Sequence, residues 1–180
     1  MEVEDQELCP RYMAVAMTGI KIGESPDWLK RDLMAVGMHS INNIVDITNY
    51  IMLDLGQPMH AFSADALNVK IKNQNEKLIK VRKARIGEKI ITLDNNECEL
   101  TPDDLVIADE EKAIALAGVM GGIGSGISSG TTTIIFESAN FNPVAIRKTS
   151  TKFGLRTDSA MRFEKSLDPG MCEVALNKAV

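Results

Sequence analysis

The sequence predicts an α+β fold in which central mixed or antiparallel β-sheets, arranged like a sandwich, are flanked by helices from both ends of the chain. Helical patterns lie near the two ends, short strand patterns fill the middle, and turn-forming residues separate the strands. A doubly wound α/β sheet would instead alternate strands and helices. No internal repeat or long linker divides the chain, so residues 1–180 are expected to form a single domain. The helical pattern is still running at Val180, which indicates a fragment of a longer chain.

One strand and two helices are predicted before residue 60. Residues 11–20 alternate enough for a strand. Ser25–Pro26 supplies an N-cap and a first-turn proline for a helix that stops at Gly37. A second helix is expected over 42–55, where Gly56 can take the positive φ of a helix end. One side of this helix is apolar, and the other carries three polar residues at helical spacing: Asn42, Asp46 and Asn49.

Short strands are predicted through the middle of the chain, separated by turn residues at 94–96 and 101–104. Residues 70–77 have the composition of a solvated loop, and 121–133 that of a long, flexible, glycine-rich loop. The predicted strands cover 78–84, 89–93, 105–109, 113–119 and 134–138.

Three helices are predicted in the last quarter of the chain. The first begins at Asn142–Pro143 and ends at Gly154, the second begins at Thr157 or Asp158, and the third runs from near Pro169 to the end.

The bulk composition is that of an ordinary globular domain, with 44% hydrophobic and 25% charged residues. A formal net charge of −5 argues against a protein that binds long nucleic acid through its phosphates, although local contacts stay open. Cys9, Cys98 and Cys172 are widely separated, which favours reduced thiols over a disulfide framework or a metal site. No apolar run is long enough to cross a membrane, and no signal peptide opens the chain, so we expect a cytoplasmic protein without a membrane partner.

Three polar or glycine-rich strings are not what a packed core alone requires. They are INNIVDITNYIMLDLGQPMHAF at 41–62, AGVMGG at 117–122 and GLRTDSAMRFEKSLDP at 154–169. The first presents His60, one of only two histidines, after a Gly-Gln-Pro turn. A phosphate-binding loop is excluded for 118–126 because no Gly-Lys-Ser/Thr follows. The strings therefore indicate a site of another kind.

Together with GEKIITLDNNECELTPDDLVIAD at 87–109 and FESANFNP at 136–143, these strings resemble the editing region, the third and fourth modules, of the bacterial-type phenylalanyl-tRNA synthetase β subunit. The resemblance runs from Cys9 to the last helix. It implies an ester hydrolase that removes tyrosine from mischarged tRNA(Phe). It also implies that this domain needs no cofactor and does not aminoacylate, because ATP and magnesium belong to the synthetic site elsewhere. The implied partners are the tRNA(Phe) acceptor end, tyrosine as the ligand, the synthetase α subunit and the remaining β modules.

An editing pocket of this kind has to recognise one hydroxyl group. An apolar synthetic pocket rejects an added hydroxyl only ~10²-fold. A carboxylate that accepts the phenol hydrogen bond reverses the preference, by roughly 1.5–3 kcal/mol. Glu137 lies in an apolar strand and matches the family glutamate that reads the hydroxyl, whereas residues alone allow a capping or ion-paired glutamate. Gly118, with its neighbour Ala117, matches the substrate-binding wall, although a glycine of a bulge or turn is the alternative.

Three residues are expected to take part in catalysis by the same resemblance. His60 would orient the attacking water, act as a base or contact the terminal adenosine, and a structural histidine is the alternative. Asn49 matches a polar residue near the ester. Thr157 and the substrate-binding Ser159 match a pocket threonine and a small residue that is usually alanine, although Thr157 also suits a helix N-cap. No serine or cysteine lies in a nucleophile motif, which favours water attack over a covalent route.

Two features bear on substrate and tRNA binding. His39–Ser40 stands where the family commonly has Arg-Pro, and histidine cannot make the bidentate contact of that substrate-binding arginine. A non-catalytic structural or tRNA-binding module with a degenerate pocket therefore stays open, as does a weaker interpretation as a peptide-binding domain. Arg156 and Lys152 are expected to contact tRNA, unless they only form a solvated helix face. They belong to a basic run: Arg147, Lys148, Lys152, Arg156 and Arg162.

Overall fold

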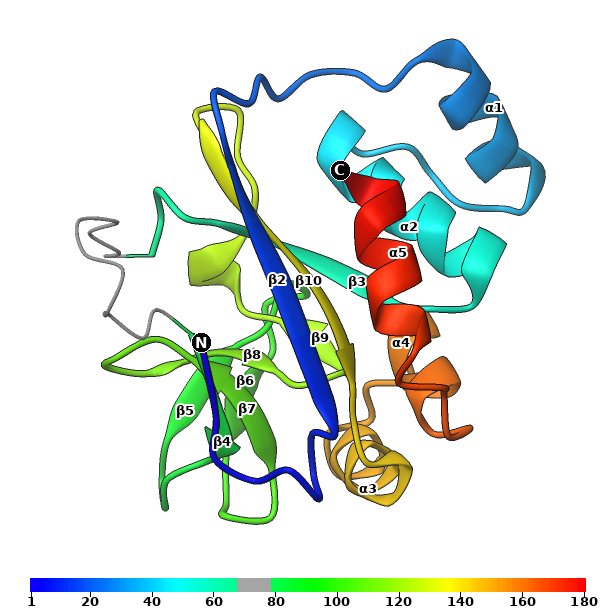
Figure 1. Ribbon diagram of the computed structural model, residues 1–180. Helices are drawn as coiled ribbons and strands as arrows, with labels where there is room; N and C mark the ends of the chain where they lie inside the picture. Colours follow the sequence, from blue (N-terminus) through cyan, green and yellow to red (C-terminus); the bar gives the residue numbers. More distant parts are fainter. Residues whose placement is uncertain (68–78) are drawn as a thin grey trace.

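The computed structural model describes residues 1–67 and 79–180 and confirms the α+β class (Figure 1). A long three-stranded antiparallel sheet runs through the middle, in the order β2-β10-β3. Its strands are β2 (Arg11–Thr18), β10 (Thr133–Asn140) and β3 (Met59–Ser63). The loop predicted at 70–77 lies outside the described residues.

A second sheet has the order β1-β4-β7-β8-β9, and β1 is parallel to β4 while the other pairs are antiparallel. A separate hairpin pairs β5 with β6. The sequence patterns missed β1, β3, β6 and β9. For β1, β6 and β9, two or three residues are too few to show alternation. The strands are β1 (Glu2–Val3), β4 (Lys80–Lys83), β5 (Lys89–Ile91), β6 (Glu97–Glu99), β7 (Leu105–Ala108), β8 (Ala113–Leu116) and β9 (Met120–Gly121).

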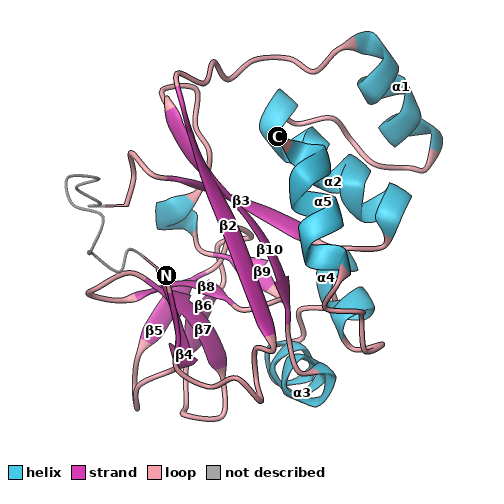
Figure 2. Cartoon of the chain, in the orientation of Figure 1, coloured by secondary structure: helices cyan, strands magenta, loops and turns pink. Residues whose placement is uncertain are grey.

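The helices α1, α2 and α5 gather on one side of the three-stranded sheet, and α3 and α4 lie near the end where β10 finishes (Figure 2). The loop predicted at 121–133 contains a short 3-10 turn, Ile123–Ser125, which the Ser125 hydroxyl secures by donating to Ile114 O at 3.0 Å. The helices are α1 (Asp27–Ala35), α2 (Asn43–Leu55), α3 (Pro143–Phe153), α4 (Asp158–Phe163) and α5 (Met171–Ala179).

The strand β10 is buried on both of its faces. Ile135 and Ala139 pack in the larger core with the five-stranded sheet, whereas Ile134 and Phe136 pack toward α2 and α5. Because side chains alternate along a strand, Glu137 points to the same face as Ile135 and Ala139. A carboxyl group is thus placed between the two sheets.

The helix N-termini follow the predicted chemistry in three cases out of four, of which Thr157 at α4 is one. The Asn42 and Asn142 side chains cap α2 and α3 by accepting hydrogen bonds from backbone N–H groups. The expected Ser25 cap is wrong: α1 has no side-chain cap, and Pro26 before it is in extended backbone. Ser25 instead donates its hydroxyl to the Asp46 carboxylate.

Asp46 is fully buried and connects the segment before α2 to the helix itself. Its carboxylate accepts from the hydroxyls of Ser25 and Ser40 and, at 2.8 Å, from the backbone N–H of Ile41. The polar stripe predicted on this helix therefore has a structural role at Asn42 and Asp46.

Replacing Asp46 by alanine is expected to destabilise the fold by about 2–4 kcal/mol, because three donors lose a buried charged acceptor. Asp54→Ala is the matched control, since Asp54 lies on the same helix and only pairs with Lys178 at the surface. Its expected cost is below about 1 kcal/mol. Urea unfolding of both variants measures the difference, and equal costs would contradict this account of α2.

Candidate functional site

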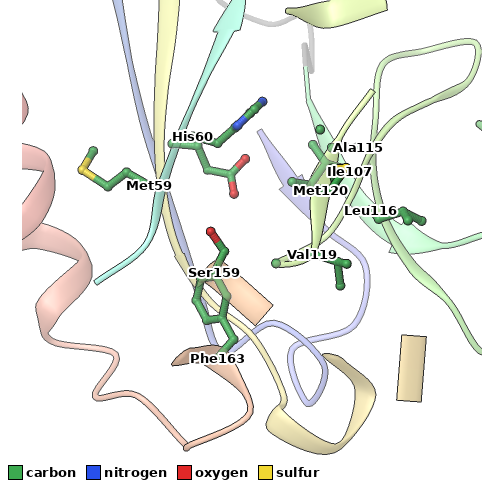
Figure 3. Close-up of a pocket in the computed structure, with 12 residues that line it drawn as sticks. Met59, His60, Ile107, Ala115, Leu116, Val119, Met120, Ser159 and Phe163 are labelled. Atoms are coloured by element: carbon green, nitrogen blue, oxygen red, sulfur yellow. The ribbon is translucent and has the colours of Figure 1, made fainter. Parts of the chain in front are cut away.

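A small cavity of about 50 Å³ lies where the two sheets meet α4 (Figure 3). Figure 3 shows His60 on one side of it, Val119 and Met120 on another, and Ser159 with Phe163 below, while the Met59 side chain points to the other side of its strand. The lining residues come from β3, β10, β7, β8, the β8–β9 turn, β9 and α4: Met59, His60, Glu137, Ile107, Ala115, Leu116, Gly118, Val119, Met120, Gly121, Ser159 and Phe163.

Glu137 is the buried acid of this cavity, with 5% of its surface exposed. The strand register places it directly opposite His60 on β3 and opposite Ala14 on β2. Its Oε2 accepts a hydrogen bond of 2.9 Å from the Tyr12 hydroxyl. Burial raises the pKa of Glu137 to about 8, against the lowering effect of the Tyr12 hydrogen bond.

The burial of Glu137 changes the expected charge of its carboxyl group. The sequence favours an ionised carboxylate as the acceptor for the phenol, because a charge-assisted hydrogen bond is stronger. Because the pKa lies near 8, the Glu137 carboxyl is mostly neutral at pH 7 and mostly ionised at pH 9. The strength of the acceptor is therefore set by pH around neutrality.

His60 lies within β3, a strand that begins directly after the Gly-Gln-Pro turn. Its ring meets the edge of Phe62, with ring centroids 4.5 Å apart. Burial lowers the pKa of His60 to about 4, so the imidazole is neutral at physiological pH. Nε2 is enclosed and has no hydrogen-bond partner in the described parts of the chain. A neutral imidazole with a free nitrogen can hold a water molecule and take its proton.

Gly121 is a pocket residue that the sequence reasoning missed. A Cβ on Gly121 would lie 2.8 Å from Cε1 and 2.9 Å from Nε2 of His60. The AGVMGG string contains three glycines, and the resemblance singled out Gly118 alone. Gly121 comes close to His60 only because the β8–β9 turn brings them together, and the local sequence does not show this contact.

Gly118 lines the cavity, and its own backbone also requires glycine. Its φ of +66° reverses the chain after β8, which is why the strand predicted over 113–119 ends at Leu116. A Cβ there would meet the Phe141, Phe163 and Ile146 side chains at 2.9–3.0 Å. The turn interpretation therefore holds alongside the cavity-lining one.

Thr157 and Ser159 have different positions relative to the cavity. The Thr157 hydroxyl donates to Val119 O at 2.8 Å and accepts from Ala160 N at 3.1 Å, so it caps α4 and anchors the β8–β9 turn. It does not line the cavity. Ser159 does, and its hydroxyl contacts the Met52 sulfur at 3.8 Å.

Three other expected residues lie away from the cavity. Asn49 is half-buried on α2, and among the described residues its side chain has no hydrogen-bond partner. Ala117 is buried and donates its backbone N–H to Leu105 O at 3.0 Å. His39 is exposed in the segment between α1 and α2. None of the three lines the cavity.

The two expected tRNA contacts also differ. The Lys152 ammonium pairs with the buried Asp104 carboxylate and donates to Thr101 Oγ1 at 3.1 Å. Arg156 is exposed and has no ion pair within the described part of the chain. Arg147 and Lys148 line a separate open groove along α3.

Over residues 1–67 and 79–180, no three histidine, cysteine or carboxylate side chains converge to hold a metal ion. In the same ranges, every helix is too short or too polar to cross a membrane.

Comparisons with known proteins place these features in one family. Residues 8–180 match the B3/4 domain. The chain is 50% identical over 179 residues to the phenylalanine–tRNA ligase β subunit of Carboxydothermus hydrogenoformans, covering 99% of this chain and 22% of that protein. It is 51% identical over 177 residues to the same subunit of Geobacter metallireducens, covering 98% and 21%.

A solved structure shares the fold: an N-terminal fragment of the phenylalanyl-tRNA synthetase β-subunit from Pyrococcus horikoshii. It has a TM-score of 0.55 and 12% identity, and the match covers 86% of this chain and 48% of that one. The chain spans about a fifth of the length of the curated relatives it matches. The match over 8–180 establishes that this chain belongs to the B3/4 domain family.

Proposed function

We propose that this chain is the editing part of a phenylalanine–tRNA ligase β subunit, and that it hydrolyses the ester of tyrosine wrongly attached to tRNA(Phe). The single observation that carries the proposal is the pairing of Glu137 with His60 across β10 and β3, in one cavity. Glu137 suits recognition of a hydroxyl group, and His60 suits activation of a water molecule. The names of the relatives support the ligase context.

Each pocket residue has a distinct part in the proposed reaction. The Glu137 carboxyl accepts the tyrosine hydroxyl, a group that phenylalanine lacks. The neutral His60 imidazole holds the attacking water through Nε2 and receives its proton as the ester carbonyl is attacked. Thr157 contributes indirectly, since it anchors Val119 in the wall of the cavity.

The cavity has to widen for a tyrosyl ring to enter. An apolar cavity of about 150 Å³ is known to take benzene, three times the volume found here. Met120 lines the cavity and is half-buried, and unbranched methionine side chains adapt easily. Movement of the Met120 side chain is therefore a low-cost way to enlarge the cavity.

The proposed partners are the acceptor end of tRNA(Phe), the α subunit and the other β modules, in the cytoplasm. No cofactor is needed for this hydrolysis, and aminoacylation with ATP and magnesium would take place elsewhere in the enzyme. Arg156 is the better placed of the two expected tRNA contacts, because Lys152 is engaged by Asp104.

A non-catalytic module is the second candidate, and the position of His39 favours it. The family arginine at this place binds substrate by resemblance, but His39 is exposed and lies outside the cavity wall. Without the family arginine, the pocket would bind the tyrosyl group but would not hydrolyse the ester. The experiment below separates the two.

At pH 9, where the Glu137 carboxyl is mostly ionised, Glu137→Gln is expected to lower the preference for tyrosyl over phenylalanyl esters about 10- to 100-fold, since the variant loses a charged acceptor. The measurement compares deacylation of tyrosyl-tRNA(Phe) and phenylalanyl-tRNA(Phe) by this chain and by the same sequence within an assembled ligase. Glu173→Gln is the control, because Glu173 only pairs with Arg11 at the surface. No deacylation above background in either setting would reject editing in favour of the non-catalytic module.

Gly121→Ala is expected to slow hydrolysis of both esters at least tenfold, because its Cβ would displace the His60 ring. Gly124→Ala is the matched control in the same loop, where a Cβ meets no atom within 4 Å. Single-turnover deacylation measures both variants. A Gly121→Ala protein as active as the control would remove His60 from the mechanism.

The Glu137→Gln variant should also gain stability relative to the unsubstituted protein as pH rises from about 4.5 to about 8. In that window the folded protein holds a proton on Glu137 that the unfolded chain releases, so its unfolding free energy falls with pH. Glutamine does not titrate, and the other groups cancel in the comparison. Urea unfolding at pH 5, 7 and 9 measures the difference, and a constant difference would show that Glu137 titrates normally.

A further inference from the structure

Tyr12 contacts the proposed recognition group from outside the cavity. It lies on β2 opposite Ala139, two residues beyond Glu137 on the neighbouring strand, so the two side chains are diagonal neighbours on one face. The Tyr12 hydroxyl donates to Glu137 Oε2 at 2.9 Å, yet Tyr12 does not line the cavity. One phenol of the protein itself thus already bonds the carboxyl that is proposed to bind the phenol of the substrate.

The two carboxyl oxygens of Glu137 are therefore not equivalent. Oε2 is bonded to Tyr12, whereas Oε1 has no hydrogen-bond partner among the described residues and is not fully enclosed. Because Glu137 lines the cavity, Oε1 is the oxygen available to a ligand there. Because Tyr12 holds Oε2, the Glu137 side chain is already oriented before a ligand binds, and Oε1 stays open to that ligand.

We propose that Tyr12 is a positioning residue that determines specificity: its hydroxyl holds Oε2 of Glu137 so that Oε1 alone accepts the hydroxyl of a tyrosyl ester. This inference rests on the proposed function, and it explains how one buried carboxyl selects a single phenol. Preorganised acceptors of this kind discriminate better than mobile ones, because less ordering is left to the binding step.

The Tyr12 hydroxyl also influences when Glu137 ionises. Its hydrogen bond lowers the carboxyl pKa that burial raises, so its removal should raise that pKa further. Burial and the Glu137 charge hold the pKa of Tyr12 well above its ordinary value, and Tyr12 stays a donor throughout the working range.

The other titratable groups around Glu137 do not change charge between pH 5 and 9. Burial raises the pKa of the Cys9 thiol far above its usual range and that of Cys172 to about 11. His60, from β3, stays neutral because burial lowers its pKa to about 4. A pH effect on the tyrosine preference in this window therefore reports on Glu137.

The test measures the ratio of kcat/KM for tyrosyl-tRNA(Phe) over phenylalanyl-tRNA(Phe) between pH 6 and 9, in the assembled ligase. For the unsubstituted protein the ratio should rise with pH through about 8. Tyr12→Phe, which keeps the ring, should lower the ratio about tenfold at pH 7.5 and move its rise to higher pH. Tyr50→Phe is the matched control, since Tyr50 packs against Trp28 and Lys178 and does not touch Glu137.

The outcomes separate this inference from the function on which it rests. If the unsubstituted ligase shows no tyrosine preference, or Glu137→Gln leaves that preference intact, the proposed function fails and the role of Tyr12 with it. If Glu137→Gln abolishes the preference but Tyr12→Phe changes neither the ratio nor its pH midpoint, only the role of Tyr12 is overturned. An equal loss of activity on both esters with an unmoved midpoint would also overturn it, because that is the effect of a packing defect.

A second measurement does not depend on a Tyr12 variant folding. The chain has two tyrosines, so in Tyr50→Phe the ultraviolet absorbance of phenolate follows Tyr12 alone. A hydroxyl bonded to the Glu137 carboxylate should resist ionisation beyond pH 10, where an ordinary tyrosine titrates. Ionisation at the ordinary pH in the folded protein would show that the hydrogen bond is absent and would overturn the proposal.

Discussion

The burial of a carboxyl group in the middle of β10 is the constraint on which the rest of the site depends. β10 packs against the five-stranded sheet on one face and toward α2 and α5 on the other, so Glu137 cannot reach bulk solvent by bending away. An acid in such a place needs a partner, or it stays protonated. Tyr12 supplies one hydrogen bond, and the cavity leaves room for a second.

The same burial gives His60 its chemical character. The antiparallel register places the imidazole opposite Glu137, where desolvation keeps it neutral. Gly121 allows this placement because any Cβ there would collide with the ring. An acceptor for a hydroxyl and a neutral base therefore stand side by side as a consequence of strand pairing and one turn. No metal is required for either role in this account.

The sequence predicted the longer elements and the motifs well, for physical reasons that can be named. Asn42, Gly56, Asn142 and Gly154 are strong helix-end signals, and each lies at the end of a helix. Ser25 misled because its hydroxyl has a better acceptor in Asp46, which is distant in sequence. Strands of two residues, such as β9, carry no periodic signal of their own.

The details of the site were less predictable, because they arise from contacts between distant strands. The resemblance singled out Glu137 and His60, and both line one cavity, but neither the shifted carboxyl pKa nor the Tyr12 hydrogen bond has a local sequence signal. Likewise, the local sequence gives no sign that Lys152 on α3 pairs with the buried Asp104 carboxylate. Asn49, Ala117 and His39 lie outside the cavity wall, so their expected roles stay predictions.

The central claim, that the Glu137 carboxyl reads a phenolic hydroxyl, can be observed directly by carbon-13 NMR of its side-chain carboxyl. The protein would be titrated with non-hydrolysable amide analogues of tyrosyl- and phenylalanyl-adenosine at pH 7.5. We expect the tyrosyl analogue to shift the Glu137 resonance and to lower the Glu137 pKa from about 8, because a hydrogen-bond donor stabilises the ionised form. An identical response to both analogues would contradict it.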